Sequence, residues 1–467
     1  MSLLSLRSPA AVRATIRVVA LAVLVAVAAS APAAAGSKGS DAVSVWNANA
    51  GKAAVSACIS PVGPSPAEAR MYAMTHIAIH DALNAISRRS EPYAYDARAR
   101  HNASPDAAVA AAAHDVLVPL LGQLSTLVPP ACVNAAVAGV EADYAAALAA
   151  VRDGKAKDRG LAVGQDAAAA ILKLREGDRA QALTVGDPAY VEGTAPGEYR
   201  FTPGTPFAFA PKLGELTPFV LRSASQFRPG PPHLVTDSRY TADFNEVKGL
   251  GGNVVTTPSA RTPDETQIAL FWVESSPLQW NRIARTAAAS AGLDAWEQAR
   301  LFGLLNMALT DGYTGTFETK YLYKYWRPVT AIRLAASDGN PDTAADPTWT
   351  PLVETPPIPD YDSGHSVEGG AAAAVLRGYF GRDRAMFASC STTLPDGSQC
   401  GQAGQVVRAY SSFSQAAAEN GLSRILVGFH FREAVEVGIA HGARIGQRAV
   451  NRFMEPVHHG HGHGGHH

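Results

Sequence analysis

Hydrophobic residues recur along most of the chain at the three- and four-residue spacing that is typical of helices. Between residues 66 and 86, for example, Met71, Met74, Ile77 and Ala78 share one face of the predicted helix. The same spacing predicts further helices at 107–121, 133–152, 157–176, 238–250, 263–272, 280–290, 294–325, 366–380, 404–421 and 431–453. Because the alternation typical of strands is scarce, we expect a mainly α protein, built as a helical bundle or as two packed four-helix bundles.

Two proline-rich stretches without periodicity, at 177–232 and 338–362, interrupt the helices. The first contains Phe209 and Phe219 among several aromatic residues, so we expect an ordered loop that packs on the helices. Long ordered loops often carry function, which makes this stretch a candidate functional segment.

The N-terminal segment has the organisation of a secretory signal peptide. Arg7, Arg13 and Arg17 precede an apolar stretch at 18–29, and an Ala-x-Ala site ends at Ala35. We expect cleavage near Ala35 and a secreted, periplasmic or extracellular protein, with an uncleaved anchor as the alternative. We find no later long apolar run that is free of charges, so we expect no integral membrane association.

These boundaries divide the chain into three parts. Residues 1–35 are the predicted signal peptide, and 36–455 are expected to form a single domain. Residues 456–467 form a tail in which six histidines alternate with glycine, and such a tail is too short and flexible to fold.

Composition and charge narrow the function. The 467 residues include 40 Lys+Arg and 41 Asp+Glu, for a net charge of −1, and 47% of them are hydrophobic. This apolar fraction excludes a wholly disordered chain, and the charge balance argues against nucleic-acid binding. Because only 7% of the residues are aromatic and Ala is abundant, we expect closely packed helices.

The chain has four cysteines, which an exported protein would hold as disulfides. Cys390 and Cys400 flank a short loop that contains Gly and Pro, so we expect them to pair. Cys58 and Cys132 then form the second pair. No Cys-x-x-Cys spacing occurs in the sequence, which argues against a zinc or thioredoxin-like site.

Two segments combine cations with other reactive side chains. In the first, Lys320 and Arg327 precede Pro328, and we expect both near one face of a helix that ends at Pro328. In the second, Arg424 is followed by His430 after five intervening residues. Either segment alone is more often a solvated helix face or a structural histidine than a ligand site.

A Ser-Gly-His motif, Ser363 to His365, lies directly before the helix predicted at 366–380. Gly364 lets backbone N–H groups approach a ligand closely, and the start of a helix attracts anions. His365 adds a candidate proton donor. The motif is weak on its own, because a serine before a helix is often only a cap.

The side chains of the three segments suit one kind of ligand when they are taken together. They supply three cations, several hydrogen-bond donors and two histidines, which fits a tetrahedral or trigonal-bipyramidal oxyanion. A slightly acidic chain has little use for such a cluster unless an anion binds in it. The seven candidate residues are Lys320, Arg327, Ser363, Gly364, His365, Arg424 and His430.

These motifs, Lys-x6-Arg-Pro, Ser-Gly-His and Ser-Arg-x5-His, resemble the active-site signature of the type 2 phosphatidic acid phosphatase and vanadium haloperoxidase superfamily. Surrounding segments such as Pro356-Pro357-Ile358-Pro359 are most similar to the soluble, exported haloperoxidases of bacteria. The resemblance runs from about Trp46 to about Phe453. It implies that 36–455 is one catalytic domain.

The resemblance also implies roles. His430 is similar to the axial vanadate ligand of the haloperoxidases, while the cations, the Ser363 hydroxyl and the Gly364 N–H would bind the other oxygens. His365 would move protons, and Lys320 would polarise hydrogen peroxide so that bromide or chloride attacks it and hypohalous acid forms. The implied cofactor is vanadate, or phosphate in the same pocket. The implied partners are hydrogen peroxide, halide and a small organic acceptor.

One position departs from the signature, because Asp362 replaces the proline that usually precedes Ser-Gly-His. If its carboxylate pointed inward, it would weaken anion binding and raise the pKa of His365. Otherwise we expect it to pair with a nearby Arg or to cap the helix. Phe317 and Ile358 are expected where some chloride-oxidising members place large aromatics, which leaves the halide preference open.

Several alternatives stay open. One is a phosphatase that hydrolyses phosphate monoesters through a phospho-His430 intermediate, and another is a degenerate, inactive pocket. A third is a non-catalytic exported helical protein that holds metals with its His-rich tail. His76 and His80 are a further candidate metal pair, against the alternative that they are core histidines. A homodimer is the assembly that we consider.

Overall fold

The structure, a computed structural model, describes residues 41–183, 186–187 and 189–457. These described residues belong to one compact unit. The signal peptide predicted at 1–35 and the histidines of the predicted tail lie outside the described residues.

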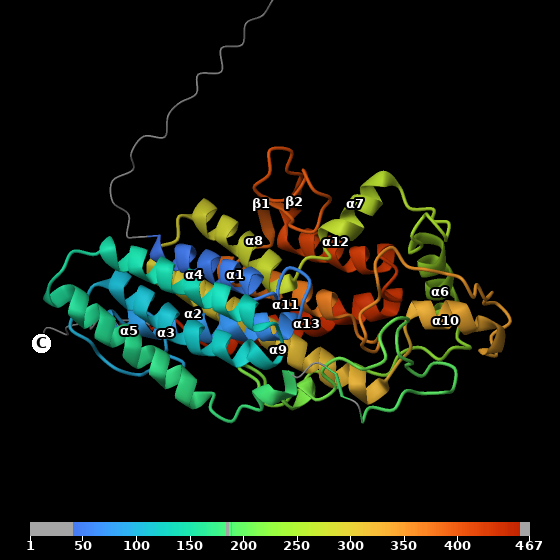
Figure 1. Cartoon of the computed structure of the whole chain (residues 1–467), viewed down its shortest axis with the longest axis horizontal. Coiled ribbons are helices and arrows are strands. Elements are labelled where there is room, and N and C mark those ends of the chain that lie inside the picture. Colours follow the sequence, from blue (N-terminus) through green and yellow to red (C-terminus); the bar gives the residue numbers. More distant parts are fainter. Residues whose placement is uncertain (1–40, 184–185, 188, 458–467) are drawn as a thin grey trace, which may run out of the picture. The chain divides into compact units, whose positions relative to one another are not determined.

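The described residues form thirteen α-helices and one two-stranded antiparallel sheet, which confirms the mainly α class (Figure 1). The first eight helices are α1 (Ala42–Ser56), α2 (Ser65–Ile86), α3 (Pro105–Gln123), α4 (Pro130–Ala149), α5 (Lys155–Leu174), α6 (Ser238–Leu250), α7 (Pro263–Phe271) and α8 (Ser276–Ala291). The remaining elements are α9 (Ala295–Tyr323), α10 (Pro328–Leu334), α11 (Gly364–Phe380), β1 (Arg384–Cys390), β2 (Val407–Ser412), α12 (Phe413–Leu426) and α13 (Arg432–Arg452).

Three local predictions differ from the structure. The sequence pattern missed α1 and α10, and the helix predicted at 404–421 is wrong in its first half, where β2 pairs with β1. Helix α12 instead begins after Ser412, whose side chain accepts a hydrogen bond from the N–H of Gln415. A two-stranded hairpin this short has too few alternating positions to stand out in the sequence.

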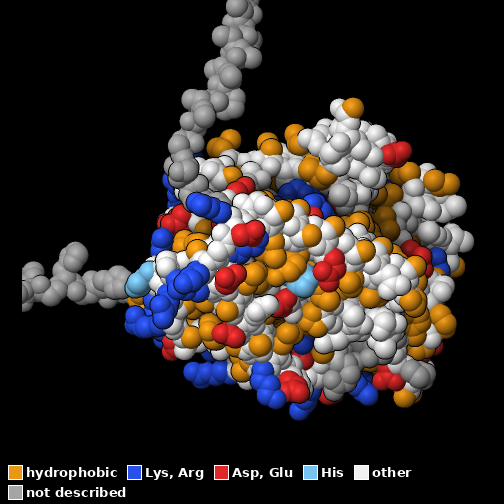
Figure 2. Space-filling view, turned by 60° about the vertical axis from the view of Figure 1, so that its left-hand side comes forward, with side chains coloured by type: hydrophobic (Ala, Val, Ile, Leu, Met, Phe, Trp, Pro, Cys, Tyr) orange, Lys and Arg blue, Asp and Glu red, His pale blue; other side chains and the backbone are white. Residues whose placement is uncertain are grey.

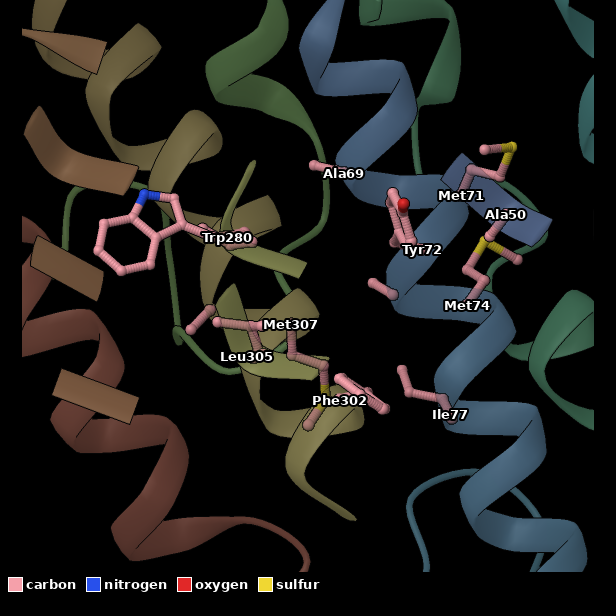
Figure 3. Close-up of a cluster of buried hydrophobic side chains, with 14 of the residues drawn as sticks. Ala50, Ala69, Met71, Tyr72, Met74, Ile77, Trp280, Phe302, Leu305 and Met307 are labelled. Carbon is pink, nitrogen blue, oxygen red and sulfur yellow. The ribbon is translucent and has the colours of Figure 1, made fainter. Parts of the chain in front are cut away.

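The helices form two packed groups. Helices α2 to α5 pack together, as do α9, α11, α12 and α13, and contacts between α2 and α9 join the groups. Figure 3 shows this junction, where Tyr72 and Ile77 of α2 approach Phe302 and Met307 of α9. The arrangement corresponds to the expected pair of four-helix bundles.

Helices α11 and α13 approach each other unusually closely. A Cβ atom added at Gly442 of α13 would lie 1.9 Å from the carbonyl oxygen of Val367, and one at Gly370 of α11 would lie 2.2 Å from that of Ile439. Only glycine allows backbones to come this near. The contact fixes the first two turns of α11 beside the middle of α13.

Helix α3 is the one helix among the described residues that is long and apolar enough, by length and composition alone, to cross a membrane. This segment contains the charged residues Asp106 and Asp115, so it is not a charge-free run of the kind whose absence was predicted. Inside the unit, 67% of the apolar window is buried, and α3 packs against α2, α4 and α5. An alanine-rich core helix meets the same criterion as a membrane span.

Both predicted disulfides are confirmed. Cys58 pairs with Cys132, and Cys390 with Cys400. The first bond ties the end of α1 to α4, and the second closes the loop between β1 and β2. The face in Figure 2 mixes hydrophobic side chains with both kinds of charge, in keeping with the small net charge.

Candidate functional site

Lys320 and Arg327 reach the site from different elements. Helix α9 ends at Tyr323, Lys324 follows in a left-handed conformation, and Arg327 directly precedes α10. The prediction that both cations share one helix is therefore wrong. Arg327 donates from Nε to the carbonyl of Ile358 at 2.6 Å and from Nη1 to that of Phe429 at 3.0 Å.

Lys320 is fully buried on the last turns of α9. Its Nζ donates to the carbonyl oxygens of Pro359 and Asp360, each at 2.8 Å. Burial, reinforced by the charge of Arg327, lowers the pKa of Lys320 well below its usual value. In this structure the ammonium group holds the loop that leads into the Ser-Gly-His motif.

The Ser-Gly-His motif forms the start of α11, as predicted. Ser363 directly precedes the helix, and its hydroxyl accepts a hydrogen bond from the hydroxyl of Ser366 at 2.8 Å. A Cβ atom added at Gly364 would meet nothing within 4 Å, so the helix start faces open space. The Nε2 of His365 lies 3.3 Å from the carbonyl oxygen of Glu274.

Arg424 and His430 complete the cluster from the end of α12 and the turn that follows. Arg424 donates to the carbonyl of Trp272 at 2.7 Å and lies over the ring of Phe429, with its central carbon 5.0 Å from the ring centre. The Nε2 of His430 lies 3.0 Å from Nη1 of Arg327. Burial, and then the charge of Arg327, lowers the pKa of His430 well below its usual value.

Asp362 does not take any of the positions predicted for it. Its carboxylate is fully buried, accepts a hydrogen bond from Thr316 at 2.7 Å and contacts Nδ1 of His441 at 2.9 Å. It does not line the cavity described below. The partners are a threonine of α9 and a histidine of α13, and no pattern in the sequence indicated either of them.

Sequence reasoning also missed Asp360, although it lies three residues before Ser363. Its Oδ1 is 2.9 Å from Nδ1 of His430 and 3.9 Å from the guanidinium of Arg327. Burial raises the pKa of Asp360 to about 7, against the lowering effect of Arg327. The signal that could have indicated Asp360 is a carboxylate just before the Ser-Gly-His motif, in a site that is otherwise expected to be cationic.

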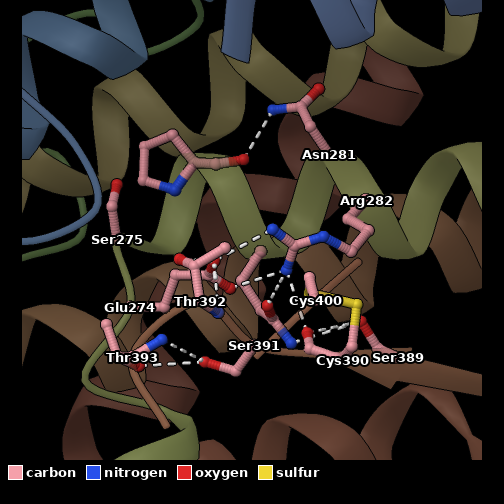
Figure 4. Close-up of polar contacts among 12 residues, drawn as sticks. Glu274, Ser275, Asn281, Arg282, Ser389, Cys390, Ser391, Thr392, Thr393 and Cys400 are labelled. Atoms are coloured by element: carbon pink, nitrogen blue, oxygen red, sulfur yellow. Dashed lines mark hydrogen bonds and ion pairs between the residues drawn. A yellow bond between two sulfur atoms is a disulfide. The ribbon is translucent and has the colours of Figure 1, made fainter. Parts of the chain in front are cut away.

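The segment between α7 and α8 holds two of the candidate side chains in place through its backbone carbonyls. Its Trp272 and Glu274 carbonyls contact Arg424 and His365, as described above. The Glu274 carboxylate pairs with Arg282 at 2.6 Å and accepts from the N–H of Thr392 at 3.1 Å (Figure 4). Arg282 also donates to the carbonyl of Cys390 at 2.9 Å, so the disulfide-closed hairpin is part of this support.

One cavity of about 350 Å³ connects most of the candidate residues. Five of the seven line it, namely Arg327, Gly364, His365, Arg424 and His430, whereas Lys320 and Ser363 lie outside the lining. Phe317 and Ile358 line the same cavity, as the sequence predicted. Phe209 also lines it, so the long loop at 177–232 does contribute to the site.

The cavity fits a small oxyanion. Nη2 of Arg327 and Nε of Arg424 are buried without a hydrogen-bond partner among the described residues. Burial lowers the pKa of both guanidinium groups, that of Arg424 to about 9. Burying such charges is costly unless a counter-charge lies beside them. The unpaired donors and the open start of α11 match vanadate or phosphate in both charge and hydrogen bonding.

The candidate metal pair on α2 has other partners. His76 contacts Nδ2 of Asn47 at 2.8 Å, and His80 contacts Asp81 and Ser90, each at 2.8 Å. Within the described part of the chain, no group of three or more His, Cys, Asp and Glu side chains could hold a metal ion. These contacts favour the core interpretation of both histidines.

The comparisons with known proteins agree with the motifs. The family description "VCPO second helical-bundle domain" matches residues 300–459, which include all seven candidate residues. A curated relative, the vanadium chloroperoxidase of Curvularia inaequalis, is 26% identical over 280 residues. This match covers 48% of the present chain and 45% of the relative, so the chain matches less than half of the relative's length.

Two solved structures are similar over nearly the whole chain. A bacterial vanadium-dependent iodoperoxidase has a TM-score of 0.71 at 25% identity, covering 90% of this chain and 97% of its own. The holo form of a bacterial vanadium-dependent chloroperoxidase has a TM-score of 0.65 at 17% identity, covering 87% and 95%. At that lower identity, the second likeness concerns the fold alone.

Proposed function

We propose that the chain is a member of the superfamily of vanadium haloperoxidases and type 2 phosphatidic acid phosphatases, and that it is a vanadate-dependent haloperoxidase that oxidises bromide or chloride with hydrogen peroxide. The observation that carries the proposal is a pair of buried guanidinium nitrogens without a hydrogen-bond partner among the described residues, Nη2 of Arg327 and Nε of Arg424, in the cavity that His430 and the start of α11 also line. The vanadium peroxidases among its relatives support it.

His430 would bind vanadate directly through a ring nitrogen. Its Nδ1 lies 2.9 Å from Asp360, which leaves Nε2, beside Arg327, as the atom available to an anion. The lowered pKa of His430 keeps the imidazole neutral, and a neutral nitrogen has the lone pair that ligation requires. Arg327, Arg424 and the Gly364 N–H, which line the cavity, would balance and bind the remaining oxygens. Lys320, which lies outside the lining, would hold the loop that leads to Ser363.

His365 would act as the acid and base of the reaction. Its Nε2 faces the Glu274 carbonyl, which can only accept a hydrogen bond, so Nε2 holds the proton and Nδ1 is the free base. Burial and the charge of Arg424 lower the pKa of His365, which keeps Nδ1 ready to take a proton from hydrogen peroxide. Bound vanadate would supply a Lewis acid that activates the peroxide without changing its own oxidation state.

The discriminating experiment compares two reactions of the purified protein. With orthovanadate, hydrogen peroxide and bromide, we expect bromination of an organic acceptor; without vanadate, we expect little hydrolysis of p-nitrophenyl phosphate. The opposite result, with hydrolysis that disappears in His430→Ala, would favour the phosphatase alternative and a phospho-His430 intermediate.

We further propose that residues 36–455 act as one catalytic domain and that the chain is exported after cleavage near Ala35. The two disulfides support an oxidising compartment. Sequencing the N-terminus of the exported protein tests the second proposal. Recovery of an intact residue 1 from the soluble exported fraction would contradict it.

A further inference from the structure

A second hollow lies between α2, the end of α3 and the segment that follows α5. It consists of a pocket of about 250 Å³ and an adjoining groove of about 540 Å³. Arg70 and Leu120 line both parts, so the pocket and the groove are continuous. None of the described residues that line this hollow also lines the cavity at His365 and His430. The hollow is therefore a separate candidate site.

Arg70 lies where the pocket meets the groove. It belongs to the second turn of α2, and only 6% of it is exposed. Its Nε donates to Oδ2 of Asp178 at 2.9 Å, whereas its two Nη groups have no hydrogen-bond partner among the described residues. Both Nη groups are accessible from the hollow that this side chain lines. A guanidinium edge with two free donors matches the two oxygens of a carboxylate.

Asp178 does not use Arg70 alone. The Nε of Arg175 donates to the same carboxylate oxygen at 3.1 Å, and Arg175 also donates to the carbonyls of Thr217 and Pro218. One carboxylate is thus shared by two guanidinium groups, of which Arg175 is held by the protein. The positive charge of Arg70 is only partly balanced within this cluster.

The wider groove is also cationic. Asp311 interacts with Arg175 but lies outside the lining, where it accepts hydrogen bonds from three backbone N–H groups. The charged residues of the lining are two carboxylates, Glu176 and Asp178, and four cations, Arg70, Lys173, Arg175 and Arg179. This balance attracts anions and disfavours cationic ligands.

The pocket beyond Arg70 is apolar. Its small volume lies below the roughly 300–1,000 Å³ of drug-sized sites, so it suits a short alkyl chain or a single ring. The aliphatic side chains that line it are Ala67, Met71, Leu120, Leu124, Leu127 and Leu183. An anion that carries a small apolar group would place that group here and remove it from water.

We propose that this hollow is a second ligand site, which binds a small amphipathic carboxylate. The carboxylate pairs with the free Nη groups of Arg70, and the apolar tail fills the pocket beside Leu124 and Leu127. The proposal does not depend on the proposed haloperoxidase function, because no residue of the catalytic cavity takes part.

The first test measures binding of three probes to the full-length protein by calorimetry. Octanoate should bind at least tenfold more tightly than 1-octanol, which lacks the charge, and than acetate, which lacks the tail. Equal affinity for 1-octanol would show that Arg70 is not used, and equal affinity for acetate would show that the pocket is not used. Either result, or no binding of octanoate, would overturn the proposal.

Two arginine variants locate the charged contact. Arg70→Gln should weaken octanoate binding at least tenfold, and Asp178 keeps Arg175 as its partner in this variant. Arg179→Gln removes the same charge from an exposed position in the groove, where Arg179 pairs with Glu215 at 3.6 Å. It should change the affinity less than twofold. Equal losses in the two variants would mean that octanoate responds to the general charge of the groove, which would overturn the contact with Arg70.

A third variant guards against misfolding of Arg70→Gln. Leu127 is half-buried at the pocket, so Leu127→Trp should fill the pocket while the ion pair of Arg70 and Asp178 stays intact. The affinity for octanoate should fall to that for acetate. An unchanged affinity for octanoate would overturn the proposed place of the tail.

The last variant separates this site from the catalytic cavity. Arg424→Gln removes a cation from that cavity and should leave octanoate binding unchanged. If Arg424→Gln lost octanoate binding while Arg70→Gln kept it, the ligand would lie in the catalytic cavity and the proposal would be overturned. None of these measurements uses bromination, so failure of the proposed function would leave their result standing.

Discussion

The Asp362 carboxylate and the His441 imidazole lie 2.9 Å apart in the core, between the start of α11 and helix α13. Thr316 of α9 donates to the other carboxylate oxygen at 2.7 Å. The residue that departs from the family signature therefore joins three helices at the site. Its carboxylate interacts with neighbours that do not line the cavity. It therefore does not face the anion pocket, whose lining keeps its cationic side chains.

Replacement of Asp362 by proline tests this relationship. Asp362→Pro should leave vanadate affinity within about twofold, because the lost carboxylate does not line the pocket, and should lower the free energy of unfolding by about 1–3 kcal/mol, because His441 and Thr316 lose their partner. Equilibrium dialysis and urea unfolding measure the two quantities. Asp362→Asn, which keeps an acceptor for Thr316, should lose less stability. Much tighter vanadate binding by the proline variant would mean that the carboxylate acts on the pocket after all.

The close contact of α11 with α13 predicts a sharp sensitivity at Gly442. A Cβ atom there would lie 1.9 Å from the Val367 carbonyl oxygen, so Gly442→Ala must push the helices apart. We expect a loss of about 1–3 kcal/mol in unfolding free energy and weaker vanadate binding, because the first turn of α11 carries Gly364 and His365.

Gly139 provides the matched control, since it is also a helical glycine but a Cβ atom there would meet nothing within 4 Å. Gly139→Ala should be neutral or slightly stabilising. Equal thermal unfolding temperatures for the two alanine variants would contradict the close-packing account.

The buried carboxyl group of Glu68 should make the free energy of unfolding depend on pH. Burial raises its pKa from 4.5 to about 8, and its partners include the hydroxyl of Ser275. Between these values the folded protein holds a proton that the unfolded chain has released, so this group's contribution to stability falls as the pH rises. Glu68→Gln has no such proton. Urea unfolding from about pH 5 to about pH 8 should show the wild type losing about 1.4 kcal/mol per pH unit relative to Glu68→Gln. Parallel pH profiles would show that Glu68 is not protonated in the fold.

Removal of the residues after Pro456 separates the enzyme from the metal-binding alternative. The described cavity residues end at His430, so the truncated protein should brominate at the rate of the full chain. Copper binding should fall, because six histidines are removed. Loss of bromination on truncation, restored by a metal salt, would favour the alternative.

The sequence predicted the fold class and most helices because apolar spacing is a local property, and Ser238–Leu250 was predicted to the residue. It also predicted both disulfides. It could not show that Lys320 and Arg327 belong to different elements, because the left-handed turn at Lys324 leaves no pattern in its neighbours.

The candidate residues could be predicted because they belong to sequence motifs. The backbone groups that hold their side chains in place could not be predicted. The Trp272 and Glu274 carbonyls contact Arg424 and His365. Every residue has a backbone carbonyl, so the sequence does not show which carbonyls will make such contacts. Asp362 was misjudged for a similar reason. Its partner His441 is 79 residues away, and only the packing of α11 on α13 brings the two together.

In the proposed function, one pocket that contains His430 binds vanadate and uses it to oxidise halide. The most direct test is the rate of peroxide-dependent bromination of monochlorodimedone while orthovanadate is titrated into the metal-free protein. We predict a rate that rises from near zero, saturates at a single vanadate per chain and is absent in His430→Ala of equal stability. A rate that does not depend on vanadate at any pH, or that is the same in His430→Ala, would contradict the account.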